Sequence, residues 1–143
     1  MTHFRHLLAA GMLCVLAGAV LAQDAEPEID CENAMAQQDM NYCAGKDFEA
    51  ADAELNAAYK QAMAAMRETD RELGEISKTY VGAVEALKKA QRAWIGYRDG
   101  ECELAGFDAR GGSMEPMLVS GCRAEMTRKR TVELKALYQN DGN

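Results

Sequence analysis

Gln-Arg-Ala-Trp-Ile-Gly-Tyr-Arg-Asp-Gly-Glu-Cys, residues 91–102, is the stretch that decides the fold. It holds Trp94, the single tryptophan of the chain. Gln91, Trp94 and Arg98 are spaced by three and four residues, so on an α-helix they share one face, and Cys102 continues that face by one turn. Such a face predicts a helix that buries a large aromatic ring, pairs polar groups with a neighbouring helix and is fixed near its end by a disulfide.

Helical patterns extend on both sides of this stretch. The helix that contains it is predicted from about Lys78 to Ala105, and an earlier helix from about Asn41 to Arg71, where apolar residues recur every three or four positions. A Gly-rich loop over residues 106–113 precedes a third helix that ends near Tyr138. No segment alternates as a β-strand does. The sequence therefore predicts an all-α fold, a small disulfide-stapled bundle of three principal helices that run up, down and up.

Side chains that can accept hydrogen bonds from backbone amides mark the expected helix starts. Asp30 is placed to cap a short helical segment directly after it, and Asp39 to cap the first long helix. Asp70 and Ser77 lie in a polar segment over residues 68–78 that we predict to be a turn containing further caps. Ser113 is the expected cap of the third helix.

The first 22 residues have the composition of a secretory signal peptide. Arg5 precedes an almost unbroken apolar run from Leu7 to Leu21, and we expect cleavage after Ala22. The run is too short for a comfortable membrane span, and Cys14 lacks the preceding small residues of a lipoprotein box. We expect a soluble periplasmic or secreted protein, with a cleaved signal peptide over 1–22, a flexible lead-in over 23–30, one helical domain over 31–138 and a disordered tail over 139–143.

Four cysteines remain after such a cleavage, and an exported domain of this size typically uses them in two disulfides. In an up-down-up bundle all four gather at one end. We favour the local pairs Cys31–Cys43 and Cys102–Cys122, each of which would add on the order of 3 kcal/mol by restricting the unfolded chain. The other two connectivities stay open, because the shared location does not exclude them.

The charge of the chain points away from some partners and towards others. The formal net charge is −7, and it becomes −8 without the signal peptide, because Arg5 is lost and no acid is. An acidic exported protein is a poor candidate for binding nucleic acid or anionic lipid and a better one for cationic partners. A single short domain with charged outer faces is expected to stand alone as a monomer.

Catalytic and metal-binding patterns are missing from the mature sequence. Both histidines, His3 and His6, lie in the signal peptide, so no histidine remains as a base for a nucleophile. No phosphate-binding loop or metal-ligand cluster is present, and we predict a protein that is not an enzyme and needs no cofactor. Two Met-x-x-Met pairs leave Cu(I) binding as a remote alternative to core packing: Met63 with Met66, and Met114 with Met117.

Several short motifs are spread over nearly all of the mature chain: Asp30-Cys31, Cys43, Ala51-Asp52-x-x-Leu55-Asn56-x-x-Tyr59, the stretch 91–102, Gly111-Gly112-Ser113, and Cys122 with Thr127 and Arg130. In combination they resemble the LprI-like family, which is named for a lysozyme-inhibiting lipoprotein. The chain departs from that namesake in lacking the lipid-attachment cysteine. The resemblance implies a helical exported domain whose partner is a lysozyme-type muramidase, bound by occlusion of its substrate cleft.

One candidate site lies on the first two helices. Asp52, Asn56, Gln91 and Arg98 are interpreted either as a partly buried polar network, with Arg98 bridging to Asp52 and Gln91 meeting Asn56 or a backbone group, or as a docking surface with Trp94 as its apolar anchor. We weight the network more heavily, because buried polar groups are normally paired.

The second candidate site is the loop from Phe107 to Met117, which offers Phe107, Asp108 and Arg110 between two cysteines. A stapled loop suits a plug for a cationic lysozyme's cleft, since preorganisation lowers the entropic cost of binding. Two other interpretations stay open. The loop is equally well explained as a simple helix connection, and the protein as a non-enzymatic envelope interaction module with some other protein partner.

Overall fold

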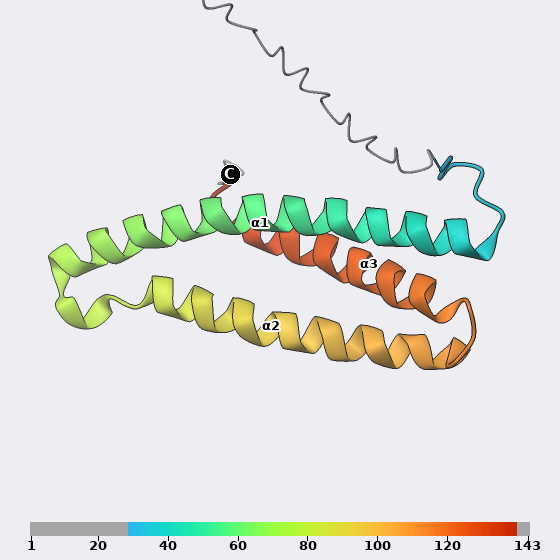
Figure 1. Ribbon diagram of the computed structural model, residues 1–143. Helices are drawn as coiled ribbons and strands as arrows, with labels where there is room; N and C mark the ends of the chain where they lie inside the picture. Colours follow the sequence, from blue (N-terminus) through green and yellow to red (C-terminus); the bar gives the residue numbers. More distant parts are fainter. Residues whose placement is uncertain (1–28, 140–143) are drawn as a thin grey trace, which may run out of the picture.

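Three long helices run up, down and up in the computed structural model, which describes residues 29–139 (Figure 1). The elements in chain order are α1 Gln37–Ile76, the 3₁₀ helix η1 Lys78–Tyr80, α2 Ala83–Gly106, the 3₁₀ helix η2 Phe107–Ala109, and α3 Glu115–Ala136. The described residues contain no strand, and the predicted all-α bundle is confirmed. The predicted signal peptide at 1–22, most of the lead-in and the last four residues of the predicted tail lie outside the described residues.

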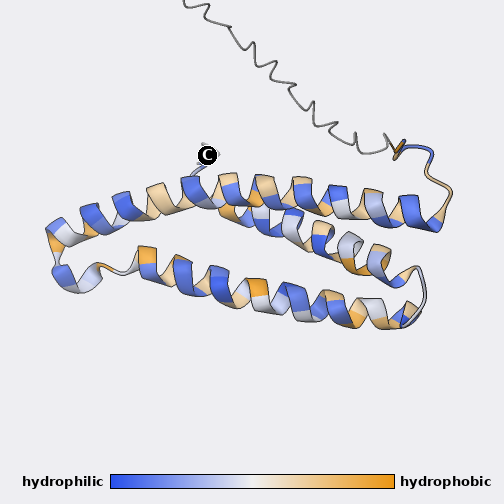
Figure 2. Cartoon of the chain, in the orientation of Figure 1, coloured by the Kyte–Doolittle hydropathy of each residue, from blue (hydrophilic) through white to orange (hydrophobic). Residues whose placement is uncertain are grey.

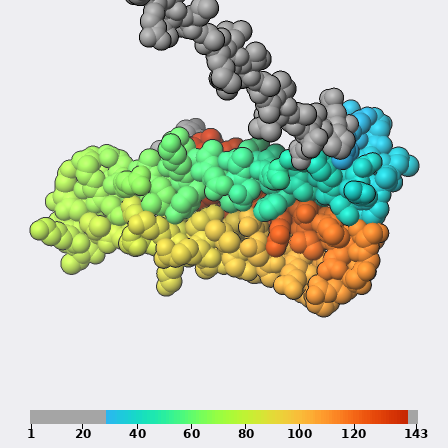
Figure 3. Space-filling view, in the orientation of Figure 1, coloured from blue at the N-terminus to red at the C-terminus, as the bar shows by residue number. Residues whose placement is uncertain are grey.

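The helices form an elongated molecule because α1 is much longer than the other two. α1 spans 40 residues and α3 spans 22, and α3 packs more extensively along α1 than along α2. In the space-filling view the surface of α1 adjoins that of α2 in the left part, and α3 shows between them towards the right (Figure 3). None of the helices in residues 29–139 is long and apolar enough to cross a membrane.

The prediction of a turn over residues 68–78 is wrong for residues 68–76, which belong to α1. α1 continues to Ile76, and the chain leaves the helix only at Ser77. Arg71 favours the continuation, because it pairs with Glu68 three residues earlier and with Glu75 four residues later, the latter at 2.6 Å. Such spacings stabilise a helix whose outer face is polar.

The expected caps at three helix starts are also wrong. Asp30 does not begin a helix. Its carboxylate instead accepts hydrogen bonds from the Glu32 amide at 3.0 Å and the Asn33 side chain at 2.8 Å, which makes a turn. Asp39 lies inside the first turn of α1. Ser113 does not cap α3, which starts one residue later than expected, after Met114, without a side-chain cap.

Asp70 caps a helix, but a distant one. Its carboxylate accepts hydrogen bonds from the backbone amides of Gly82 at 2.8 Å, Ala83 at 2.7 Å and Val84 at 3.1 Å, at the start of α2. Gly82 has a φ of 156°, a conformation that side chains disfavour. These three amides, led by that of Gly82, hold the pKa of Asp70 below its ordinary value of 3.8. One carboxylate therefore joins the end of α1 to the start of α2.

Asp70→Asn is expected to lower the free energy of unfolding at neutral pH, because a neutral amide accepts these bonds more weakly than a carboxylate does. Since the folded pKa is depressed, the stabilisation is complete above the ordinary pKa of 3.8 and is lost as the pH falls through the folded pKa. Urea unfolding at pH 7 and at about pH 2 is the measurement, and the gap between the two proteins should close in acid.

The control for this prediction is Asp108→Asn. Asp108 has no hydrogen-bond partner within the described residues, so its replacement should leave the stability unchanged at both pH values. A stability gap between the native chain and Asp70→Asn that is equally large at both pH values would show that the cap does not act through its charge.

The core lies where all three helices meet, and small side chains allow the helices to approach closely. Its buried members are Leu55, Ala58, Ala62, Met63, Leu87 and Leu134, with Tyr59, Met66, Val84, Trp94 and Tyr138 packed around them. Hydrophobic and hydrophilic residues alternate along each helix accordingly (Figure 2). The placement of Met63 and Met66 in and against this core accounts for their spacing by packing.

Both disulfides have the local pairing that we favoured. Cys31 is bonded to Cys43, with Cα atoms 5.5 Å apart, and Cys102 to Cys122, with Cα atoms 5.4 Å apart. They fix the end of the molecule at which α1 begins, α2 ends and α3 begins. Within residues 29–139 the opposite end carries no disulfide.

Candidate functional site

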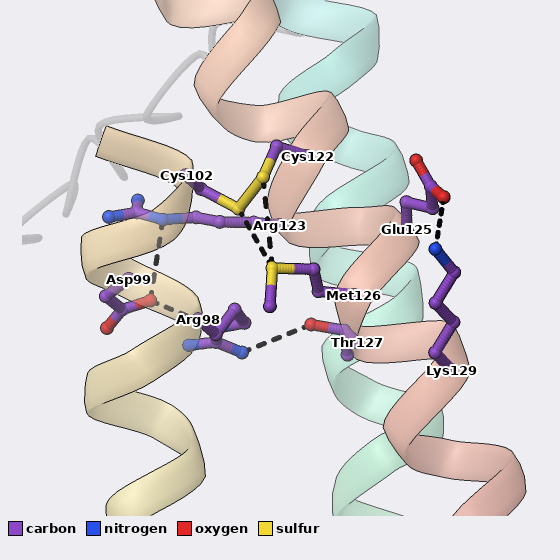
Figure 4. Close-up of a disulfide and its surroundings, with 9 residues drawn as sticks. All are labelled: Arg98, Asp99, Cys102, Cys122, Arg123, Glu125, Met126, Thr127 and Lys129. Carbon is purple, nitrogen blue, oxygen red and sulfur yellow. Dashed lines mark hydrogen bonds and ion pairs between the residues drawn. A yellow bond between two sulfur atoms is a disulfide. The ribbon is translucent and has the colours of Figure 1, made fainter. Parts of the chain in front are cut away.

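Arg98 is the centre of a polar network between the three helices. Its side chain is only 8% exposed. The guanidinium donates hydrogen bonds to Asp52 of α1 at 3.2 Å, to Asp99 beside it at 3.0 Å and to Thr127 of α3 at 3.2 Å. Figure 4 shows Arg98 reaching across from α2 to Thr127. The predicted bridge from Arg98 to Asp52 is therefore present.

Two aromatic rings enclose the same guanidinium. The Arg98 Cζ atom lies 5.1 Å from the ring centroid of Phe48 and 5.1 Å from that of Trp94. Cation–π contacts of this kind strengthen when the cation is removed from water. Trp94 thus packs against Arg98 and the core, and its side chain is partly buried.

The predicted pairing of Gln91 with Asn56 is wrong. Gln91 is buried, and its side-chain oxygen accepts a hydrogen bond from Nε of Arg130 at 3.2 Å. Asn56 instead donates to Asp52, one turn earlier on the same helix, at 2.9 Å. The reason is that α3 brings a charged donor to Gln91, while Asn56 has a carboxylate within reach on its own helix.

A groove between α1 and α2 gathers these polar residues. Its volume is about 400 Å³, and its lining is Asp52, Leu55, Asn56, Tyr59, Lys88, Gln91, Arg92, Ile95 and Arg98. Four of the five residues predicted for this site therefore share one groove. Its apolar wall includes Ile95, which is 40% exposed, so the groove has both a hydrophobic and a charged side.

The second disulfide lies next to this network. Cys102 is fully buried, and the sulfur of Met126 packs 3.5 Å from Cys102 Sγ and 4.0 Å from Cys122 Sγ (Figure 4). Arg123 crosses over the bond, and its Nε lies 3.5 Å from Asp99. The disulfide therefore holds the end of α2 against α3 and fixes the spacing across which Arg98 reaches Thr127.

Phe107, Asp108 and Arg110 lie elsewhere, in the connection between α2 and α3. The Arg110 guanidinium stacks on the Phe107 ring at 4.4 Å and pairs with Glu115 at 2.8 Å. The other oxygen of Glu115 accepts a hydrogen bond from the Gly111 amide at 2.8 Å. The loop is thus braced by its own side chains.

A further bond ties this loop to α1. The Asn41 side chain donates to the Ser113 carbonyl at 2.9 Å. Around the loop, apolar side chains face solvent: Leu104 is 63% exposed, Phe107 53% and Met114 42%. The result is a rigid tip with an apolar surface, next to both disulfides.

Sequence reasoning missed several residues on which these sites depend. Phe48 completes the surroundings of Arg98, yet nothing in its spacing distinguishes it from an ordinary residue of a helix face. Thr127 belongs to the family motifs, but its contact with Arg98 depends on how α3 packs against α2. Glu115 braces the loop from the first turn of α3. The available signal was an acid that follows the two glycines of a Gly-Gly pair by four and three residues, because carboxylates often accept hydrogen bonds from loop amides. No group of three or more metal-ligating side chains of the His, Cys, Asp or Glu type occurs within residues 29–139.

Comparison with known proteins gives a match to one protein family. Residues 30–134 match the family model described as lysozyme inhibitor LprI. An uncharacterized protein of Rhizobium meliloti is 64% identical over 132 residues, which cover 92% of this chain and 93% of that protein. The uncharacterized protein YecT of Escherichia coli is 37% identical over 62 residues, 43% of this chain and 37% of its own length.

One solved structure shares the fold. A crystal structure of a DUF1311 family protein from Pseudomonas putida has a TM-score of 0.61 to this chain at 21% sequence identity, and the similarity covers 75% of this chain and 97% of that one. At this identity the likeness establishes the arrangement of the helices.

Proposed function

The chain belongs to the lysozyme inhibitor LprI family, and from this premise we propose that it is an exported protein that inhibits lysozyme-type muramidases by occluding their substrate cleft. The observation that supports this best is the braced tip between Cys102 and Cys122. Phe107 and Met114 face solvent there. The loop that carries them is nevertheless fixed by Arg110, which stacks on Phe107 and forms an ion pair with Glu115. A preformed apolar protrusion loses little conformational entropy on entering a cleft.

The charge of the protein suits such a partner. Asp108 is an acidic residue of the tip, and the whole chain has a net charge of −7. Opposite charges raise the association rate and orient the encounter with a cationic lysozyme. The polar network around Arg98 then has a supporting role, because it holds the helices that carry the tip.

Export and the lack of catalysis are parts of the same proposal. Two disulfides are typical of proteins that fold outside the cytoplasm, which fits removal of residues 1–22 and a periplasmic or secreted location. The family is one of inhibitors, so we propose a protein that binds and performs no chemistry.

Phe107→Ala is expected to weaken inhibition by roughly tenfold or more, because truncating an exposed aromatic anchor at the centre of an interface has that effect. The measurement is the clearing of a cell-wall suspension by lysozymes of several classes, with and without the purified protein. The matched control is Tyr80→Ala. Tyr80 is a similarly exposed aromatic, 58% against 53% for Phe107, at the opposite end of the molecule.

Failure of the native protein to inhibit any tested lysozyme at large excess would remove the proposal for those enzymes. Equal inhibition by Phe107→Ala and the native protein would remove the tip from it. The groove between α1 and α2 is the second candidate surface, for a different protein partner in the envelope, because all of its lining residues except Lys88 belong to the family motifs. Ile95→Glu, a change on its exposed apolar wall, should abolish partner binding in that case and leave inhibition through the tip unchanged.

A further inference from the structure

The face of α2 that points away from the core carries an exposed apolar stripe. Tyr97 is 60% exposed and Leu104 is 63% exposed. They belong to a series in which every member is exposed and the spacing alternates between four and three residues: Ala86, Ala90, Ala93, Tyr97, Gly100 and Leu104. This spacing is the heptad pattern by which one helix packs along another, yet none of these residues belongs to the protein's own core cluster.

A groove lies along the first half of this stripe, beside Ala86 and Ala90. It has a volume of about 440 Å³, and its lining is Met66, Ala83, Ala86, Leu87, Ala90, Arg130, Glu133 and Leu137. Leu137 of α3 is 42% exposed and forms an apolar wall. The alanines leave room beside them for large side chains from another helix.

We propose that two copies of this chain pair through the α2 stripe, with their α2 helices antiparallel about a two-fold axis. Small residues occupy the first half of the stripe, and Tyr97 and Leu104 occupy the second half. Antiparallel pairing therefore places each large side chain of one copy against a small one of the other. With the two-fold axis at the level of Ile95 along α2, three pairs of residues face each other. Leu104, Gly100 and Tyr97 of one copy lie opposite Ala86, Ala90 and Ala93 of the second copy, in that order.

Gly100 supports close contact of the two helices. A glycine within a helix costs about 1 kcal/mol relative to alanine. Apart from the backbone of the same helix turn, nothing in residues 29–139 lies within 4 Å of the position that a Cβ atom would occupy there. The protein's own packing therefore does not require a glycine, whereas a second helix lying close to this face does benefit from one.

Charge selects the second copy and its direction. The first half of α2 has a net positive charge, from Lys88, Lys89 and Arg92 against Glu85, and the second half a net negative one, from Asp99, Glu101 and Glu103 against Arg98. In an antiparallel pair the basic half of each α2 lies along the acidic half of the other, while a parallel pair would set like charges together. Lys89 and Glu103 flank the stripe on the same side, and neither has a partner within the described residues. They would form two identical pairs between the copies.

This assembly is compatible with the proposed inhibitory tip. The stripe ends at Leu104, about one turn before Phe107. The antiparallel arrangement sends the two loops to opposite ends of the dimer, so that each remains available to its own lysozyme. The proposed dimer differs from the monomer that we expected from the sequence. That expectation was based on charged outer faces of the helices, whereas the structure shows that one exposed face of α2 is apolar.

The first test is the mass in solution of the full chain, purified in the form in which the cell exports it. Sedimentation velocity at roughly 100 μM should give twice the chain mass, since a dimer of even modest affinity is populated there. Leu104→Glu should shift the mass to that of a single chain. Val132→Glu is the matched control, because Val132 is 68% exposed on the opposite flank of α3 and should leave the dimer intact. A native protein that stays monomeric, or a dimer that survives Leu104→Glu, overturns the proposal.

The second test reports the direction of pairing. Reversal of one charge, by Lys89→Glu or Glu103→Lys, should weaken the dimer several-fold, and the double variant should restore it.

Cross-linking is an independent measure of the same direction. Gly96 lies beside the two-fold axis, so Gly96→Cys should give a covalent dimer with a short thiol-specific cross-linker. Gly45→Cys on α1, where an added Cβ also meets nothing within 4 Å, should give none. Equal cross-linking of the two variants, or no rescue by the double charge reversal, contradicts antiparallel pairing.

Discussion

Replacing Cys102 and Cys122 together with alanine is expected to lower the free energy of unfolding by about 4 kcal/mol. The two cysteines are separated by 20 residues, and closing a loop of this size in the unfolded chain accounts for about 3 kcal/mol. The rest follows from the void left where Cys102, fully buried, now packs against Met126. Urea unfolding of the double variant measures the change.

The other disulfide provides the comparison. Cys31 and Cys43 are separated by 12 residues. Cys31 lies before the start of α1 and is exposed, and Cys43 is only partly buried. Replacing this pair should cost roughly 1 kcal/mol less, because the loop is shorter and no void forms in the core. An equal or larger loss for this pair would show that the void beneath Cys102 is unimportant.

Arg98→Met is expected to lower the free energy of unfolding by about 3 kcal/mol, the usual cost of breaking a buried charged network by removing one partner. Methionine can fill the space between Phe48 and Trp94, so the loss should come mainly from the hydrogen bonds. Asp52 and Asp99 can turn towards solvent, but the Thr127 side chain is fully buried and loses its charged donor. The midpoint of thermal unfolding and the urea-derived stability are the measurements.

Arg92→Met is the matched control for this variant. Arg92 lines the same groove as Arg98, but it is exposed and has no ion-pair partner within the described residues. Its replacement should change the stability by no more than about 0.5 kcal/mol. If Arg98→Met keeps normal stability and loses binding to a lysozyme, the network is instead a docking surface.

Much of the fold was predictable from the sequence because one stretch combines several independent signals. The spacing of Gln91, Trp94, Arg98 and Cys102 indicated a helix with a polar inner face, and three of those four side chains are indeed buried. The bridge from Arg98 to Asp52 followed from charge and helix order. Helix boundaries were less predictable, since residues 68–76 are polar enough to resemble a turn, and the ion pairs of Arg71 keep them helical.

The partners of individual polar groups were not predictable in the same way. Asp70 was recognised as a cap, but the amides that it caps are 12 to 14 residues further along the chain, and only the return of α2 beside α1 brings them close. Arg130 reaches Gln91 for the same reason, because the rotation of α3 about its axis decides which side chain faces α2. These choices depend on the tertiary arrangement of the helices, which spacing along one helix does not encode.

Both covalent cross-links lie at one end of a long, narrow molecule, and this gives the structure a gradient of local stability. At the far end the last turns of α1 extend past α3, and the carboxylate of Asp70 joins them to α2. Partial opening will therefore begin at that end as fraying of the α1–α2 hairpin, at a free energy well below that of global unfolding. Backbone amides near Ile76 and Val84 will accordingly exchange their hydrogens with solvent long before those near Cys102, and the loop between α2 and α3 keeps its shape while the opposite end opens locally.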